Sequence, residues 1–161
     1  MKRWLPVFMG MVLLGVLQAA VVAETGGVTR PDLLVVATVL GSFQATPMRG
    51  MLLGMTAGLC SDLFSRRHLG VRTTALALAG LLTALAGGGL YRKYLALVAG
   101  VGWLVTLLVE GFTLAVLALL GLRYPWPWAF RGVVVAALWN GVLCAAVYLA
   151  GRALGLEREY R

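Results

Sequence analysis

The sequence predicts an all-α integral membrane protein, with residues 1–161 forming a single domain of six transmembrane helices whose second and third members are short. Composition is the first observation behind this expectation. Hydrophobic residues make up 61% of the chain and charged residues 12%, whereas soluble domains usually carry about 25% charged residues. The second observation is the order of the apolar residues, which fall in six stretches joined by short polar segments. No polar segment between them is long enough to bury a core of its own.

The first apolar stretch runs from about Trp4 to Ala23, long enough to cross a hydrocarbon core of about 30 Å. Its basic start, Lys2-Arg3, resembles that of a secretory signal. The apolar part of such a signal is usually about 7–15 residues long, shorter than this stretch. We therefore interpret the stretch as a first helix that is not cleaved.

The second and third stretches are separated by Pro47-Met48-Arg49-Gly50. The second starts at Arg30-Pro31-Asp32, where proline suits the first helical position and an acid suits the positive end of the helix dipole, and it runs to about Thr46. The third covers 51–64. One helix over 31–64 would be about 50 Å long, too long for a single crossing. The segment from Pro47 to Gly50 therefore predicts a break between two short helices.

The fourth, fifth and sixth stretches cover about 69–90, 94–122 and 129–154. Tryptophans and prolines at 124–128 are typical of the membrane interface. The chain has a net charge of +8, but its basic residues flank the apolar stretches, where cations meet anionic lipid, so binding of nucleic acid is not expected. The basic start and tail favour both termini in the cytoplasm of a bacterial inner membrane, although Arg66 and Arg67 oppose that orientation.

The most specific local pattern is Gly50, Gly54, Gly58 and Asp62, each four residues after the last. Residues at this spacing share one side of a helix, and small ones let another backbone approach closely. The stripe is either a surface for a partner or an ordinary packing seam inside the chain. Its carboxylate is expected to cap or pair with a neighbour, with Arg66, Arg67 and Arg72 as candidates. Leucine at Gly54 should disrupt folding or assembly, and alanine should do so less.

Glu110 is the only ionisable residue deep within the fifth stretch. An ionisable group at membrane depth usually faces a cavity, a partner or a proton path. The simpler alternative is a protonated Glu110 that is hydrogen-bonded to Asn140 or Gln18, the other polar side chains inside the helices. A ligand or ion site at Glu110 is left open.

No catalytic set emerges from the remaining residues. The chain has one histidine and two cysteines, and Cys60 and Cys144 stand in apolar stretches without a CxxC pattern, so we expect buried thiols and neither a metal nor a cofactor. The run Gly87-Gly88-Gly89 lacks the lysine and hydroxyl residue of a phosphate loop. An enzyme is therefore not expected.

The order of motifs from Arg30 to Gly70 resembles the rod shape-determining MreD family. It has a second helix led by Pro31-Asp32, a glycine-rich third helix that ends in Gly58-Leu59-Cys60-Ser61-Asp62-Leu63, and Leu69-Gly70 at the start of the fourth. One departure is Arg66-Arg67-His68, where the family usually has small polar residues.

The resemblance implies a membrane scaffold of the bacterial cell-elongation machinery. Such a scaffold binds the membrane-anchored protein MreC and helps to link cytoplasmic MreB filaments to the glycosyltransferase RodA and its transpeptidase in peptidoglycan synthesis. The stripe from Gly50 to Asp62 and the basic loop of Arg66 and Arg67 are the candidate contact surfaces, and a homo-oligomer is left open. The family is also similar to the vitamin-binding subunits of energy-coupling-factor transporters, six-helix bundles with a central pocket. That similarity provides an alternative function, the binding of a small molecule for transport.

Overall fold

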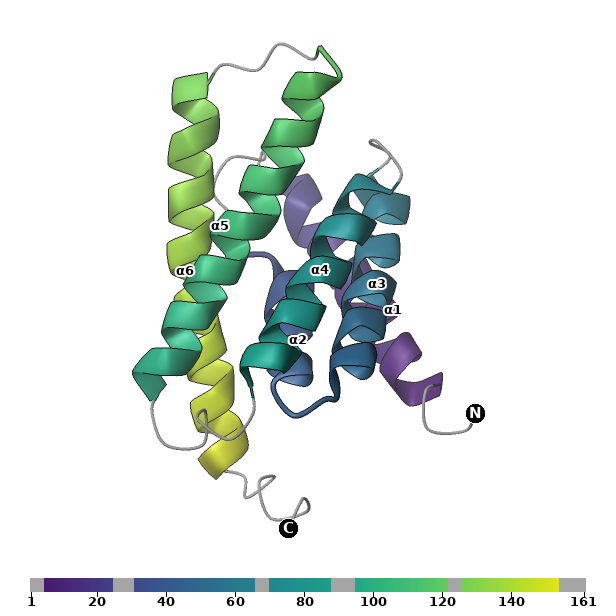
Figure 1. The fold of residues 1–161 in the computed structure, drawn as a ribbon, viewed down its shortest axis with the longest axis vertical. Coiled ribbons are helices and arrows are strands. Elements are labelled where there is room, and N and C mark those ends of the chain that lie inside the picture. The colour runs from purple at the N-terminus through teal and green to yellow at the C-terminus, as the bar shows by residue number, and fades with distance from the viewer. Residues whose placement is uncertain (1–4, 25–30, 66–69, 88–94, 122–125, 154–161) are drawn as a thin grey trace.

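The computed structural model describes residues 5–24, 31–65, 70–87, 95–121 and 126–153 of the chain. Within these residues the chain forms six α-helices, which confirms the all-helical fold class (Figure 1). The helices are α1 (Leu5–Glu24), α2 (Leu33–Ser42), α3 (Pro47–Ser65), α4 (Val71–Ala86), α5 (Leu95–Leu119) and α6 (Trp126–Ala153).

The expected break between the second and third helices lies earlier than the sequence suggested. α2 ends at Ser42 and α3 begins at Pro47, because proline fits the first turn of a helix, where its missing N–H would have no partner in any case. The amide of Gly50 donates to the carbonyl of Thr46 at 2.8 Å, so Gly50 already lies within the helix. α3 has 19 residues and is not short, whereas α2 has only 10.

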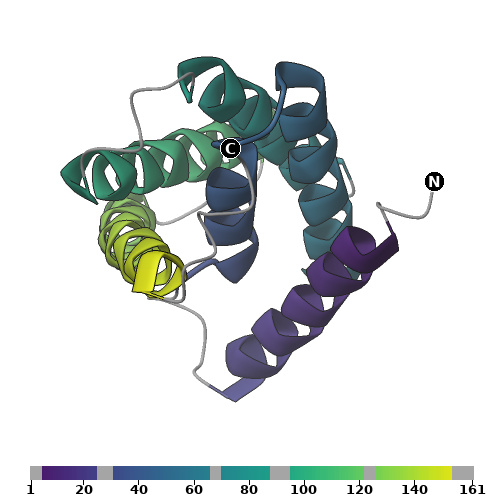
Figure 2. The same cartoon turned by 90° about the horizontal axis from the view of Figure 1, so that it is seen from below.

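α2 is the central helix of the bundle. The other helices surround it in the order α1, α3, α4, α5, α6, and each of them contacts both α2 and its neighbours in this ring (Figure 2). The ring is not closed, because α1 and α6 make no contact with each other within the described residues. Among the described residues, α2 is therefore flanked by all five other helices.

The core forms where α2 meets this ring. Leu34, Val35 and Val39 of α2 pack with Leu76 of α4 and Val109 of α5, and all five side chains are buried. Because α2 is apolar on most of its circumference, it can contact helices in several directions at once. This packing positions the first turn of α2 in the interior, next to the middle of α6.

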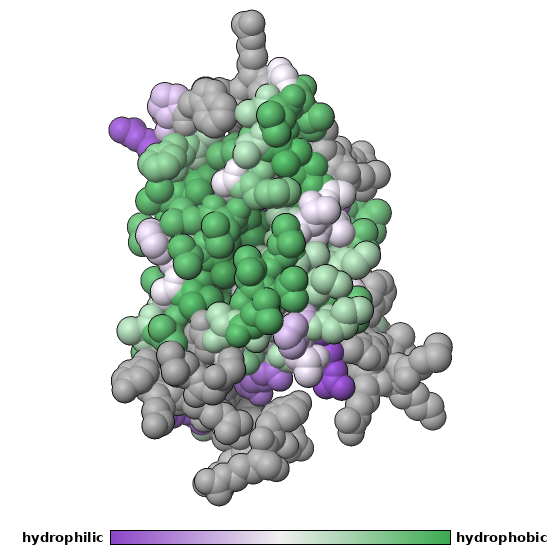
Figure 3. All heavy atoms as spheres, viewed as in Figure 1, coloured by the Kyte–Doolittle hydropathy of each residue, from purple (hydrophilic) through white to green (hydrophobic). Residues whose placement is uncertain are grey.

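Two of the described helical stretches are long and apolar enough to cross a membrane, Leu95–Leu119 and Ala129–Ala153. Only 28% and 22% of them is buried within the structure, so they are not the enclosed core helices of a soluble protein. Leu104, Leu108 and Phe112 of α5 are exposed. Figure 3 shows that apolar side chains cover the middle of the visible face and that the most hydrophilic residues lie near its two ends. Two clear spans are fewer than the six expected.

Candidate functional site

The first turn of α2 is the starting point of a polar centre inside the bundle. Asp32 has extended backbone dihedrals (φ −100°, ψ 97°) and is the N-cap of α2. Its Oδ1 accepts hydrogen bonds from the amides of Leu34 at 3.1 Å and Val35 at 3.2 Å. A carboxylate suits this position because it satisfies amides that have no partner within the helix and carries the charge that the helix dipole favours.

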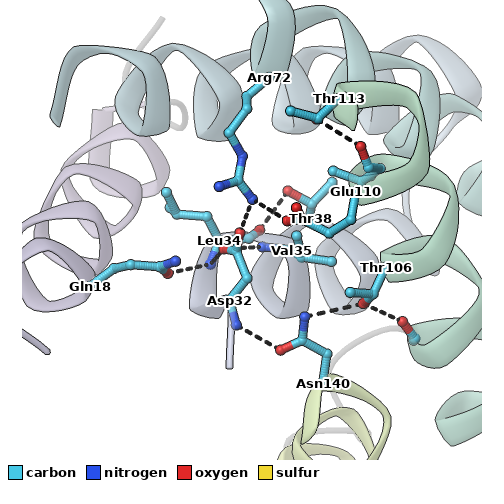
Figure 4. Close-up of polar contacts among 12 residues, drawn as sticks. Gln18, Asp32, Leu34, Val35, Thr38, Arg72, Thr106, Glu110, Thr113 and Asn140 are labelled. Atoms are coloured by element: carbon cyan, nitrogen blue, oxygen red, sulfur yellow. Dashed lines mark hydrogen bonds and ion pairs between the residues drawn. The ribbon is translucent and has the colours of Figure 1, made fainter. Parts of the chain in front are cut away.

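Arg72 joins this cap to a second carboxylate. Its Nη2 donates to Oδ2 of Asp32 and, at 2.9 Å, to Oε1 of Glu110, forming an ion pair with each (Figure 4). About a quarter of the side chains of Arg72 and Glu110 is exposed, and 8% of that of Asp32. We call Asp32, Arg72 and Glu110 the Arg72 triad. It links α4 and α5 to the start of α2.

Asn140 joins the start of α2 to α6. Its Oδ1 accepts from the backbone amide of Asp32 at 2.7 Å, and its Nδ2 donates to Oγ1 of Thr106 at 3.1 Å. Thr106 in turn donates to the carbonyl of Gly102 at 2.7 Å. Asn140 and Thr106 are fully buried. The start of α2 is therefore held at the depth of the middle of α6, with its free backbone amide satisfied by a side chain, as non-helical backbone in an apolar interior requires.

Gln18 approaches the polar centre from α1. Its Oε1 accepts from the amide of Leu34 at 3.3 Å. Side chains or backbone groups of α1, α2, α4, α5 and α6 thus meet within one small region (Figure 4). The intramembrane polar residues that the sequence singled out, Glu110, Asn140 and Gln18, do gather here.

The expected hydrogen bond from Glu110 to Asn140 or Gln18 is wrong. Glu110 pairs with Arg72, while Asn140 and Gln18 both bind the start of α2. From the sequence, Arg72 was considered only as a candidate partner of Asp62, and Asp32 only as a favourable acid in a first turn. The available signal was that two acidic residues, Asp32 and Glu110, and one basic residue, Arg72, all stand at or within apolar stretches.

The glycines of the stripe pack α3 directly on α4. A Cβ added at Gly50 would lie 2.5 Å from the carbonyl oxygen of Gly80, and one at Gly54 would overlap the carbonyl oxygen of Leu76. At Gly58 it would lie 2.8 Å from the carbonyl oxygen of Arg72. No side chain fits at these positions without a shift of backbone, so the stripe is a packing seam of the α3–α4 pair, as small residues at this spacing allow.

Asp62 at the end of the stripe caps α4. Its Oδ2 accepts from the amide of Gly70 at 2.8 Å, from the amide of Thr73 at 3.1 Å and from the hydroxyl of Thr73 at 2.7 Å. The expectation that this carboxylate caps a neighbour is confirmed. Gly70 has a positive φ of 95°, which favours glycine and turns the chain toward the carboxylate.

The other reading of the stripe, a surface for a partner, is wrong because α4 covers it and its glycines are buried. Arg66 and Arg67 lie outside the described residues. Cys60 and Cys144 are buried free thiols, as expected.

The polar centre is suited to holding helices together rather than to chemistry. Its carboxylates already receive a guanidinium and backbone amides, and its carboxamides bind backbone. Buried polar groups that satisfy one another in this way fix the relative positions of the elements that carry them. The nucleophile and base that acyl or phosphoryl transfer needs do not occur together among these residues.

The family model of the rod shape-determining protein MreD matches residues 1–154. Comparison with curated proteins and with solved structures found no match.

Proposed function

Because the chain belongs to the MreD family of rod shape-determining proteins, we propose that it is a membrane scaffold of the cell-elongation machinery. It binds MreC and helps to link MreB filaments to RodA and its transpeptidase in peptidoglycan synthesis. The observation that carries the proposal is the family match, which extends over residues 1–154 of the chain. The family is a structural component in the maintenance of cell shape and not a family of enzymes.

The interior of the bundle supports a scaffold. The charged residues of the polar centre pair with one another, and the glycine stripe is covered by α4, against which α3 packs. Partners must then bind the outer helix faces or the loops. Transmembrane helices associate by close packing and by hydrogen bonds between them, so an apolar outer face is sufficient for an intramembrane partner.

The proposal places six crossings in the bacterial inner membrane, with both termini in the cytoplasm. Its support is the alternating direction of successive helices, which brings the first turn of α1 and the last turn of α6 to the same end of the bundle (Figure 1). α2 is only about 15 Å long and spans about half of a hydrocarbon core. Its start lies in the protein interior, where Asp32 and Asn140 satisfy its backbone.

Co-purification and depletion test the function together. The full chain, tagged and co-expressed with MreC, should yield a stable complex in mild detergent. Depletion of the chain from its own rod-shaped host should produce round cells, and a plasmid copy should restore rods. Rods that persist after depletion, together with recovery of a tightly bound vitamin and an ATP-driven module in place of MreC, would support the transporter alternative and contradict the scaffold.

A further inference from the structure

The six helices fall into two closely packed units. α1, α2 and α4 all pack on α3, and α5 packs along α6. Within the described residues, α1 and α3 touch neither α5 nor α6, and α4 does not touch α6. We call α1–α4 the four-helix unit and α5–α6 the hairpin. The surface on which they meet, with α2 and α4 on one side and the hairpin on the other, is called the joint.

Close contact between backbones occurs inside each unit. In the four-helix unit it is the glycine seam between α3 and α4. In the hairpin, a Cβ added at Gly141 would lie 3.0 Å from the carbonyl oxygen of Ala99, and one at Gly102 would lie 2.6 Å from Sγ of Cys144. None of the described glycines packs the backbone of one unit against the other unit.

This difference matters because of the solvent. In lipid, apolar surface gains little from being covered, so helices are held together by close packing and by hydrogen bonds between them. The glycine seams provide close packing within each unit. The joint lacks such a seam among the described residues and therefore depends more strongly on its hydrogen bonds than either unit does.

Two links between described residues cross the joint at the polar centre. Arg72 of α4 pairs with Glu110 of α5 at 2.9 Å. The backbone amide of Asp32 donates to Oδ1 of Asn140 of α6 at 2.7 Å. Figure 4 shows both links on the same side of the start of α2 as α5 and α6. About a quarter of the side chains of Arg72 and Glu110 is exposed, which indicates that their link lies at an edge of the joint.

The hairpin extends past this edge. The buried residues of α5 lie between Val98 and Val109, and none of residues 111–121 is buried. On α6, no residue before Ala137 is buried among those whose side chains are described. Figure 1 shows the end of α5 and the start of α6 beyond the other helices. Glu110 therefore lies where the docked part of the hairpin ends.

We propose that the hairpin swings away from α2 and α4 as one body and that the two links across the joint latch it in the closed position. The pivot is the end of the joint opposite the latch, near the start of α5 and the end of α6. Opening breaks two polar links and exposes apolar side chains to lipid, whereas opening either unit would also separate packed backbones. The joint therefore opens before either unit unfolds, as a hinge between two bodies.

Distances between pairs of spin labels test the motion in the full chain. Labels at Leu63→Cys of α3 and Leu119→Cys of α5 measure across the joint, because both side chains are exposed and both helices end at the same end of the bundle (Figure 1). Labels at Leu63→Cys and Leu78→Cys of α4 measure within the four-helix unit. Both native cysteines are replaced by alanine in each protein.

Two variants each remove one link of the latch. Glu110→Leu removes the acceptor of Arg72, and Asn140→Leu removes the acceptor of the Asp32 amide. Each should add a second, longer distance to the pair across the joint and leave the pair within the four-helix unit unchanged. The absence of a longer distance from both variants would overturn the proposal, as would an equal change in the two label pairs.

Two further variants separate the latch from a general loss of stability. Glu110→Gln keeps an oxygen acceptor for Arg72 and should keep the single short distance across the joint. Gly54→Ala strains the seam between α3 and α4, away from the joint, and should add no longer distance. If Gly54→Ala opens the joint as much as Glu110→Leu does, the longer distance reports lost stability and the latch is wrong.

Discussion

Arg72 and Glu110, which are 38 residues apart in the sequence, form an ion pair of 2.9 Å that joins α4 to α5. The same guanidinium nitrogen also pairs with Asp32 at the start of α2. One side chain therefore ties three helices together in a largely buried site. In such a setting the loss of one partner is costly, because the charges left behind are neither solvated nor paired.

Replacement of Arg72 tests the importance of this tie. Arg72→Met should leave the carboxylates of Asp32 and Glu110 facing each other without a cation. Removing one member of a buried ion pair costs about 3–5 kcal/mol, and the partial exposure of Arg72 places the expected loss near the lower limit. The melting temperature in mild detergent should fall well below that of Arg131→Met, which removes an exposed arginine of α6. Equal melting of the two variants would contradict a structural role for the triad.

Glu110→Gln is expected to be mild. The glutamine oxygen can still accept from Arg72, and Asp32 continues to neutralise the guanidinium. Glu110→Leu removes the acceptor and should cost about 1–3 kcal/mol. Cells that carry Glu110→Gln should remain rods with a normal level of the protein. Loss of rod shape at an unchanged protein level would mean that the charge of Glu110 has a role beyond holding Arg72.

Asp62→Ala should weaken the start of α4. The carboxylate accepts from two backbone amides and from the hydroxyl of Thr73, and loss of a side chain that satisfies the amides at the start of a helix usually costs about 0.5–2 kcal/mol. Asp62→Asn keeps one oxygen acceptor and should be less harmful. Thermal unfolding of the two variants in the same detergent gives the comparison. An alanine variant as stable as the asparagine variant would show that the cap contributes little.

The topology can be tested with reporter fusions. Fusions after Gly26 and Tyr124 should report the periplasm, and a fusion after Arg161 should report the cytoplasm. The reason is the basic start and tail, together with the placement of the first turn of α1 and the last turn of α6 at one end of the bundle (Figure 1). A periplasmic report from Arg161 would reverse the orientation.

Local properties of the chain were predictable because they depend on neighbours in the sequence. Apolar stretches predicted six helices, and the spacing of Gly50, Gly54 and Gly58 predicted close packing. The start of α3 was misplaced because proline was interpreted as a breaker, although Pro47 occupies the first turn. Proline breaks a helix when it lies in the interior, but it is compatible with the helix when it lies in the first turn.

Contacts between distant helices were not predictable from one sequence. The pairing of Arg72 with Asp32 and Glu110 depends on which helix faces meet around α2, and periodicity shows only that a helix has a face. The role of the stripe from Gly50 to Asp62 could not be predicted for the same reason. An internal seam and a surface for a partner have the same spacing, so only the position of α4 distinguishes them.

Substitution at Gly54 measures how tightly this seam is packed. Because a Cβ at Gly54 would overlap the carbonyl oxygen of Leu76, Gly54→Ala already requires a shift of backbone, at a cost of about 1–3 kcal/mol. Gly54→Leu should separate α3 from α4 and reduce the amount of folded protein in membranes.

Gly111→Ala and Gly111→Leu are the matched controls. A Cβ at Gly111 would have nothing within 4 Å, so both variants should behave as wild type. Because the seam is internal, the defect at Gly54 should appear in the isolated protein as well as in cells. A Gly54→Leu protein that melts normally on its own but no longer binds MreC would return the stripe to the list of partner surfaces.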